Sequence, residues 1–206
     1  MDDTNQKLHW ENIYATKEEQ DFSWFQEYPK TSVEFLSLFN LSKGANIIDV
    51  GGGDSHFVDA LIDLNYENIY VLDISAKAIE RAKARLAGNA SKVNWIVSDI
   101  TTFIPPVRFD LWHDRAAFHF LTTEDKIKRY VKAAEHGIKK DGYMILGTFS
   151  ENGPSKCSGL EIKQYSQVSM SLRFKNEFEK IKCIEELHST PFKIMQHFLF
   201  CSFRKK

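Results

Sequence analysis

The chain has 206 residues, a length that fits one domain, and its 27 basic side chains almost balance 28 acidic ones, which leaves a net charge of −1. Hydrophobic residues make up 43% of the chain, enough for a packed core, so global disorder is disfavoured. The balanced charge argues against a protein that holds nucleic acid through bulk positive potential, and no apolar run reaches the ~18 residues that a membrane span needs.

The three cysteines, Cys157, Cys183 and Cys201, include no CxxC pair. This odd count predicts no disulfide framework and fits a reducing cytoplasm, and residues 1–7 show neither the basic nor the apolar region of a secretory signal. His197 lies four residues before Cys201, but the spacings of the C-terminal cysteines and histidines match no zinc pattern. We therefore expect a cytoplasmic protein without a metal site.

Residues 8–40 predict two amphipathic helices separated by a short irregular piece. Trp10 and Tyr14 lie at helical spacing in the first. Apolar residues at 33–39 mark the second, which is expected to end near Lys43 and Gly44. We expect residues 1–43 to form a helical lid that precedes the main fold.

From residue 46 the pattern changes to alternating strands and helices. Five apolar runs typical of buried strands occur at 46–50, 68–73, 93–97, 109–113 and 142–149. Helical patterns separate them, with Ser75 as the expected cap of one helix and another helix at 123–137. This alternation predicts βαβ units and a mostly parallel sheet with helices on both faces.

After residue 150 the rhythm breaks. A loop rich in Gly, Pro and Ser at 151–159 precedes a short helix expected near 163–172. Two extended stretches, 178–188 and 192–203, have no helix between them and predict an antiparallel hairpin at the sheet edge. The predicted fold class is therefore α/β, a Rossmann-like seven-stranded sheet of five parallel strands plus a C-terminal antiparallel hairpin.

The first strand runs into a glycine-rich loop, Asp49-Val50-Gly51-Gly52-Gly53-Asp54-Ser55. Glycines let the backbone turn tightly and approach a ligand. A dinucleotide fingerprint fails here because Asp54 and His56 occupy the positions where it needs its last glycine. Acids beside the glycines are a poor match for a pyrophosphate and favour a cationic ligand, with a plain structural turn as the alternative.

Three further strand ends carry polar residues. Asp73 follows Gly53 by 20 residues and could accept hydrogen bonds from both hydroxyls of a ribose. Asp99 and Ile100 could bracket an adenine edge, and His113-Asp114-Arg115 ends the fourth strand. Each acid alone fits an ordinary cap or loop residue, but acids at three successive strand ends indicate a shared ligand site.

These residues resemble motifs I, II and III of class I S-adenosylmethionine-dependent methyltransferases, with Ser55 in place of the last glycine of the family's loop. The resemblance covers essentially the whole chain, and the sheet with a terminal antiparallel hairpin is that family's fold. More specific segments resemble a subgroup of small, mostly bacterial methyltransferases of unassigned substrate: Trp10-x-x-x-Tyr14, 110–122 and 153–160. More distantly, the chain is similar to thiopurine and trans-aconitate methyltransferases and to seven-strand protein-lysine methyltransferases.

The resemblance implies that S-adenosylmethionine gives up its methyl group by in-line displacement, with S-adenosylhomocysteine as the product. The residues implied to hold the cofactor are Gly51 and Gly53 at its methionine part, Asp49 at the ammonium, Asp73 at the ribose, Asp99 and Ile100 at the adenine edge, Ile74 on the adenine face, and Trp10 and Tyr14 closing over it. Aromatic faces near a sulfonium are favourable by ~0.5–2 kcal/mol each. For Trp10 and Tyr14, packing on the sheet as a hydrophobic latch is an equal alternative.

The acceptor side is expected at the fourth strand end, the loop after the fifth strand and the lid. His119 is the candidate general base because imidazole titrates near neutrality, with a core or capping histidine as the alternative, and Asp114 is the second catalytic candidate. The candidate substrate residues are Trp24, Arg115, Phe118 and Phe149. Arg115 could bind an acidic substrate or pair with Asp114, and the pair is the simpler interpretation.

The sequence therefore predicts a cytoplasmic methyltransferase that acts on a small molecule, because little chain lies outside the core fold. A protein-lysine methyltransferase and a non-catalytic cofactor-binding module are the alternatives, and His56 and the antiparallel ending disfavour an oxidoreductase. We expect neither nucleic acid nor membrane as a partner, and a monomer or weak dimer. We expect one domain, 1–206, with the lid at 1–43, the cofactor-binding core at 44–150 and the substrate-side loop, helix and hairpin at 151–206.

Overall fold

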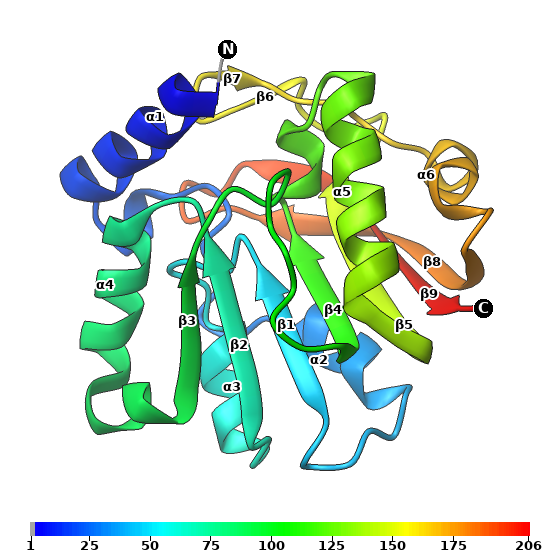
Figure 1. The fold of residues 1–206 in the computed structure, drawn as a ribbon. Helices are drawn as coiled ribbons and strands as arrows, with labels where there is room; N and C mark the ends of the chain where they lie inside the picture. The colour runs from blue at the N-terminus through cyan, green and yellow to red at the C-terminus, as the bar shows by residue number, and fades with distance from the viewer. Residues whose placement is uncertain (1–2) are drawn as a thin grey trace.

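The protein was studied as a computed structural model, which describes residues 3–206 and their side chains from residue 5 onward. A seven-stranded sheet with the order β3-β2-β1-β4-β5-β9-β8 forms its centre (Figure 1). The strands are β1 Asn46–Val50, β2 Asn68–Asp73, β3 Val93–Val97, β4 Phe109–Arg115, β5 Ile138–Phe149, β8 Phe178–Ser189 and β9 Met195–Lys205. The first five are parallel, and β9 runs antiparallel to β5 and β8, which confirms the predicted fold class.

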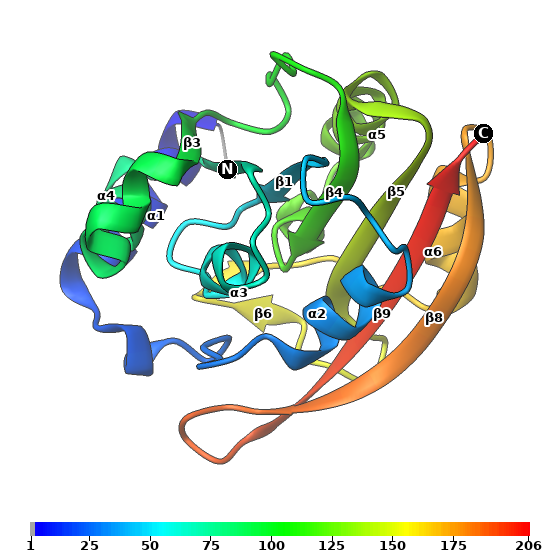
Figure 2. The same ribbon diagram turned by 90° about the horizontal axis from the view of Figure 1, so that it is seen from below.

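Helices cover both faces of the sheet (Figures 1 and 2). One face holds α2 Lys30–Ser37, α3 Phe57–Asp63 and α4 Ala76–Leu86, and the other holds α5 Glu124–Gly137 and α6 Gln167–Phe174. Because the central strands are buried on both faces, they need apolar side chains at nearly every position, and four of the five residues of β1 are buried. This explains why their sequences are continuous apolar runs.

The N-terminal segment lies over the carboxyl end of the sheet. It comprises α1 Asp3–Thr16 and the short 3-10 helix η1 Glu19–Asp21, and two further 3-10 helices, η2 Ala87–Lys92 and η3 Phe118–Phe120, occur later in the chain. Helix α1 packs against α4 and buries Trp10 and Tyr14. Helix α2, in contrast, packs Phe35 and Leu36 against the face of the sheet that α3 and α4 also cover. It ends at Ser37, earlier than expected, and Asn40 shortly afterwards adopts a left-handed φ of 47° that a helix does not continue through.

The segment after β5 differs from the prediction in two ways. Residues 151–159, expected to be a loop, include half of a small hairpin of β6 Lys156–Cys157 and β7 Leu160–Glu161, which turns at Ser158 and Gly159 with positive φ angles at both. Helix α6 begins about four residues later than predicted. Its start is set by Ser166, whose hydroxyl accepts a hydrogen bond from Ser169 N at 3.2 Å.

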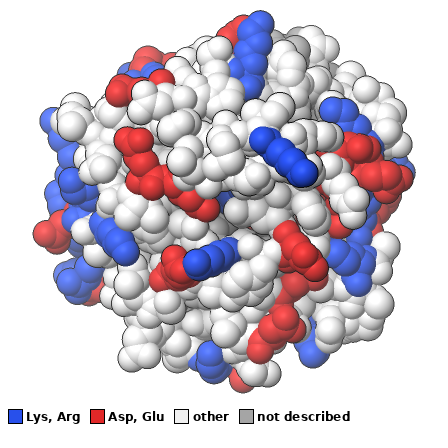
Figure 3. Space-filling view, turned by 180° about the vertical axis from the view of Figure 1, so that it is seen from behind, with Lys and Arg blue, Asp and Glu red and all other residues white. Residues whose placement is uncertain are grey.

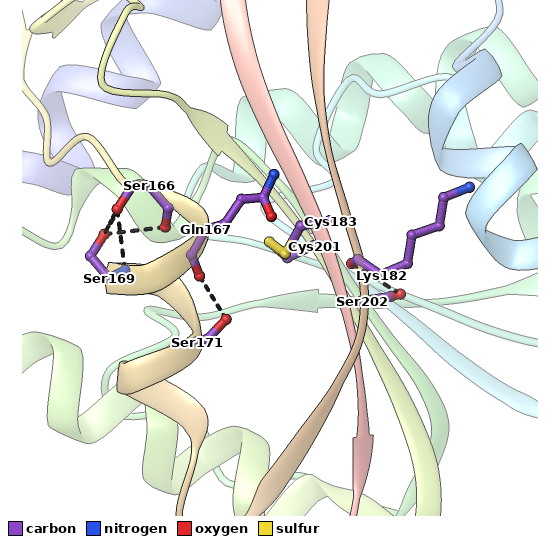
Figure 4. The surroundings of a disulfide bond; sticks show 8 residues. All are labelled: Ser166, Gln167, Ser169, Ser171, Lys182, Cys183, Cys201 and Ser202. Carbon is purple, nitrogen blue, oxygen red and sulfur yellow. Dashed lines mark hydrogen bonds between the residues drawn. A yellow bond between two sulfur atoms is a disulfide. The ribbon is translucent and has the colours of Figure 1, made fainter.

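A disulfide joins Cys183 of β8 to Cys201 of β9 (Figure 4). The expectation of no disulfide framework was therefore wrong for this pair. The two residues are 18 apart in sequence, and only the register of the hairpin places them directly opposite each other. The Cys201 sulfur is consequently not available as a metal ligand, while Cys157 is a free, buried thiol. The cytoplasmic location stays a prediction.

Candidate functional site

A pocket opens beyond the carboxyl ends of β1, β2, β3 and β4, and residues of α1 line it. Parallel strands end at one edge of the sheet, so residues that follow them meet there. The predicted site residues found in its lining are Trp10, Tyr14, Trp24, Asp49, Gly51, Asp73, Ile74, Asp99, Ile100 and Arg115. Residues that the sequence did not single out also line it, among them Ser32, Phe22, Phe120 and Cys157.

The glycine loop brings backbone close to its neighbours. Gly51 has a φ of +68°, and a Cβ there would lie 2.5 Å from the Ala117 Cβ. Gly53 is not part of the pocket lining; a Cβ at this position would lie 2.6 Å from Asp73 Oδ2. Gly51 therefore shapes the pocket, whereas Gly53 gives room to the Asp73 carboxylate.

Asp73 lies at the end of β2 and is only 5% exposed. Its Oδ1 accepts a hydrogen bond from Ser75 N at 2.8 Å. Burial raises the pKa of Asp73 to about 7, and the charges of Asp49 and Glu11 act in the same direction. At the neighbouring strand end, Asp99 Oδ1 accepts from Thr101 N at 2.7 Å. Both acids are held by backbone amides of their own loops.

A buried hydrogen-bonded chain holds Asp49. His113 Nδ1 lies 2.6 Å from Asp49 Oδ1, and His113 Nε2 lies 2.8 Å from Ser32 Oγ. The Nδ1–H tautomer of His113 donates to Asp49 and accepts from the serine hydroxyl. Asp49 Oδ2 is buried and has no hydrogen-bond partner among the described residues. These hydrogen bonds therefore hold one oxygen of the Asp49 carboxylate and leave the other free to accept from a ligand.

An ion-pair network ties the glycine loop to the N-terminal segment. Asp54 pairs with Arg81 at 2.9 Å and with Arg85 at 2.7 Å, and Arg85 also pairs with Glu19 of η1 at 2.8 Å. Burial raises the pKa of Asp54 to about 6, with the Glu19 charge adding to it and both arginines opposing it. Asp59 of α3 completes the network, 2.8 Å from Arg85.

Six Trp, Tyr and Phe side chains line the pocket, and we call five of them the aromatic lid: Trp10, Tyr14, Phe22, Trp24 and Phe120. Trp10 lies edge-on to Phe120 with ring centroids 5.0 Å apart, and Phe22 stacks on Trp24 at 4.7 Å. Aromatic faces attract cations, so this cover suits a positively charged ligand.

The two predicted catalytic residues lie outside the pocket lining. Asp114 is fully buried and accepts hydrogen bonds from Ala117 N at 2.9 Å and from the Tyr130 hydroxyl at 2.7 Å, so it shapes the loop after β4. His119 is fully buried, its Nδ1 accepts from Phe149 N at 3.3 Å, and burial together with Arg115 lowers its pKa to about 3. An imidazole that stays neutral and enclosed is a poor proton acceptor for a ligand. The catalytic assignments therefore have no support from the geometry.

Two of the predicted substrate residues also lie elsewhere. Phe118 is fully buried against Tyr130 and Tyr165, and Phe149 packs on Phe198. The short helix η3 turns both Phe118 and His119 into the core, which the apolar pattern of the segment alone does not reveal.

A family model described as "Methyltransferase domain" matches residues 41–196, and the chain belongs to this family. Its sheet has the strand order and the terminal antiparallel hairpin of the class I S-adenosylmethionine-dependent methyltransferases, as the sequence predicted. In fold, it is similar to the solved N-methyltransferase NodS from Bradyrhizobium japonicum WM9 with S-adenosyl-L-homocysteine, with a TM-score of 0.72 at 18% identity over 99% of both chains.

Curated relatives include proteins with different acceptors in their names. Malonyl-[acyl-carrier protein] O-methyltransferase 1 of Ilyobacter polytropus is 24% identical over 175 residues, which are 83% of this chain and 62% of that protein. EEF1A lysine methyltransferase 2 of Homo sapiens is 21% identical over 157 residues, 67% of this chain and 65% of that protein. The chain thus spans less than two thirds of the length of either relative.

The pocket residues fit S-adenosylmethionine. The free Asp49 oxygen matches its ammonium, the buried Asp73 carboxylate matches a pair of hydroxyl donors, and the aromatic lid matches a sulfonium. Gly51 keeps clear the space that a side chain would fill.

Proposed function

We propose that this protein transfers a methyl group from S-adenosylmethionine to a small-molecule acceptor. The observation that carries the proposal is the enclosure of the pocket, since Trp10 and Tyr14 of the aromatic lid are each only 8% exposed. When bound, the cofactor supplies an electrophilic methyl group on a sulfonium. An acceptor enclosed with it beneath such a cover must be compact.

The proposed roles of the chain's residues in holding the cofactor follow the geometry. Asp73 would accept hydrogen bonds from the ribose hydroxyls, and Asp49 would accept from the ammonium through its free oxygen. Asp99, Ile100 and Ile74 would enclose the adenine at the ends of β2 and β3. These residues bind and orient the cofactor, and the aromatic lid excludes water.

The proposal assigns no side chain as a general base that would remove a proton from the acceptor. His56 lines the pocket, but its Nδ1 lies 3.1 Å from Glu27 O and its Nε2 lies 3.4 Å from Glu19 Oε1. Burial raises the pKa of the Cys157 thiol to about 12, so this side chain stays protonated. We therefore expect an acceptor that is nucleophilic without help from a protein base.

The test is methyl transfer from labelled S-adenosylmethionine in a lysate of a strain that lacks the gene. Purified protein should transfer label to a species that passes an ultrafiltration membrane, and the Asp73→Ala variant should not. Label found only in the retained macromolecules would contradict the small-molecule proposal. Cofactor binding without any turnover would instead favour a non-catalytic binding module.

A protein side chain is the second candidate acceptor, and one observation favours it. The tip of the β8–β9 hairpin exposes Leu187, Phe192, Ile194 and Met195, and it lies beside Phe25 and Gln26 of the N-terminal segment (Figure 2). An apolar surface near a site entrance is typical of protein contacts. Transfer of label to one discrete protein band would support this candidate.

A further inference from the structure

The guanidinium of Arg115 at the end of β4 is a cation without an ionic partner among the described side chains. Its Nη1 donates to Trp24 O at 2.8 Å, and its Cζ lies 5.0 Å from the centre of the Phe198 ring. Nε is buried without a hydrogen-bond partner, and no ion pair joins Arg115 to an acid among the residues whose side chains are described. A guanidinium carries five N–H donors, so most of its bonding capacity is unused by the protein.

The expected pairing of Arg115 with Asp114 does not occur. Successive residues of a strand point to opposite faces, and Asp114 turns toward Tyr130 on the face that α5 covers. Glu186 and Asp49 are the acidic groups whose fields reach Arg115, but neither forms an ion pair with it. Burial lowers the pKa of Arg115 to about 10, which still leaves it charged at neutral pH.

Such a cation in a pocket wall favours an anionic ligand. Withdrawing a charge from water is costly unless an opposite charge and hydrogen bonds compensate it. The planar guanidinium matches the two oxygens of a carboxylate in its own plane, and stacking on Phe198 covers one of its faces. The nearby charges of Asp49 and Glu186 favour a monoanionic group over a phosphate dianion.

We propose that Arg115 binds a carboxylate of the methyl acceptor, so that the acceptor belongs to the class of small carboxylic acids. The inference rests on the proposed function. The strand order separates the two ends of the pocket: Asp73 and Asp99 follow β2 and β3, whereas Arg115 ends β4, on the far side of β1. Arg115 therefore lies on the side away from the predicted nucleoside contacts and next to Trp24.

The methionine carboxylate of the cofactor is the other source of the same chemistry, and calorimetry distinguishes the two. S-adenosylhomocysteine carries this carboxylate and 5′-methylthioadenosine lacks it. We expect Arg115→Met to change the dissociation constants of both compounds by less than about twofold. A loss of affinity for S-adenosylhomocysteine alone would assign Arg115 to the cofactor and overturn the inference.

The acceptor site is then probed in protein saturated with S-adenosylhomocysteine. Butyrate, benzoate and succinate are titrated alongside butyramide, benzamide and succinamide. We expect at least one carboxylate to bind better than its amide, and Arg115→Met to weaken that binding by ~10-fold or more, as the loss of charged hydrogen bonds implies. Arg115→Lys should retain part of it, because the charge remains without the planar fork.

The exposed Arg129, which pairs with Asp125 on α5, provides a matched control, and Arg129→Met should leave all these constants unchanged. Equal binding of carboxylates and amides, or carboxylate binding that persists in Arg115→Met, would overturn the inference. Both results are separable from failure of the proposed function, because a protein that binds no S-adenosylhomocysteine at all fails at the earlier step.

Discussion

At the scale of one residue, the buried carboxylate of Asp73 lowers the stability of the fold when it is ionised. Its carboxylate is buried beside Gly53, next to the like charges of Asp49 and Glu11, and its pKa is raised to about 7. An acid of ordinary pKa in the unfolded chain loses its proton near pH 4. Between pH 4 and 7 the folded protein therefore binds more protons than the unfolded chain, and the contribution of Asp73 to stability falls as the pH rises.

We predict that Asp73→Asn stabilises the ligand-free protein while it weakens cofactor binding. Asparagine keeps an acceptor for Ser75 N but carries no charge, so the gain should be small at pH 4 and reach ~1–3 kcal/mol at pH 8. Urea denaturation across this pH range, with calorimetry of S-adenosylhomocysteine, measures both effects. A gain that does not depend on pH would show that the carboxylate is not ionised at a cost in the folded state.

At the same scale, the structure reassigns residues that the sequence had grouped together. Asp114 and Arg115 are neighbours in sequence, yet one fixes the loop after β4 and the other lines the pocket. His113, which had no assigned role, positions Asp49, whereas His119 lies in the core. The register that places Asp49 opposite His113 was an available signal, because both lie near the carboxyl ends of neighbouring parallel strands.

At the scale of elements, Glu11 joins the N-terminal segment to the main fold. Its Oε1 accepts from Ala76 N at 2.8 Å and its Oε2 from Ser75 Oγ at 2.9 Å, at the N-terminus of α4. Partial burial opposes the charged form, but the hydrogen bonds from Lys77, Ala76 and Ser75 leave the pKa of Glu11 below its usual value. An acid at this position is favoured by the helix dipole as well.

We predict that Glu11→Gln loosens α1 without disturbing the sheet. Hydrogen exchange of residues 3–29 should accelerate, and the affinity for S-adenosylhomocysteine should fall by ~3–10-fold because the aromatic lid closes less often. Glu80→Gln is the matched control, since among the described residues Glu80 forms only an exposed ion pair with Lys77 at 3.2 Å. Faster exchange in β1 as well would indicate general destabilisation rather than a loosened lid.

The terminal hairpin of β8 and β9 is cross-linked by a disulfide. The disulfide closes the 18-residue span between Cys183 and Cys201, and on the α6 side of the sheet it lies near Ser166 and Gln167 (Figure 4). Cross-linking a loop of this length stabilises a fold by ~3 kcal/mol through the unfolded state.

We predict that reduction of the disulfide lowers the free energy of unfolding by up to ~3 kcal/mol. Urea denaturation of the oxidised and reduced protein measures this, and the variant Cys183→Ala with Cys201→Ala should match the reduced protein. Cys157→Ala, which removes the free thiol, should keep the full response to reductant. A wild type that responds to reductant no more than the double variant would contradict the presence of the bond.

At the scale of the whole molecule, the near-zero net charge conceals an uneven distribution. On the face seen in Figure 3, acidic and basic side chains are interspersed. The pocket is different. Asp49, Asp73 and Asp99 line it along β1, β2 and the loop after β3, and Arg115 lines it at the end of β4. In the proposed function, the three acids would favour a cationic cofactor and Arg115 would favour an anionic acceptor. None of the described helices has the length and hydrophobicity to span a membrane.

The N-terminal region contains two parts with different positions in the fold. Residues 3–29 cover the pocket, whereas α2, which we had placed with the lid, supports the opposite layer through Phe35 and Leu36. We propose one methyltransferase domain in which the N-terminal part of the lid is confined to α1, η1 and the irregular segment before α2, while η3 contributes Phe120. The aromatic residues divide in the same way, between the two core layers and the aromatic lid.

The sequence by itself determined the strands, the parallel sheet with its terminal hairpin, and the acids at the strand ends. These follow from local periodicity and from the rule that parallel strands end at one edge, so Asp49, Asp73 and Asp99 had to meet. Only the tertiary structure decided the rest: the Cys183–Cys201 bond, the burial of His119 and the contact of Arg115 with Trp24 instead of Asp114. Each depends on hairpin register or on the face that a side chain takes, and these are set by packing between segments far apart in the chain.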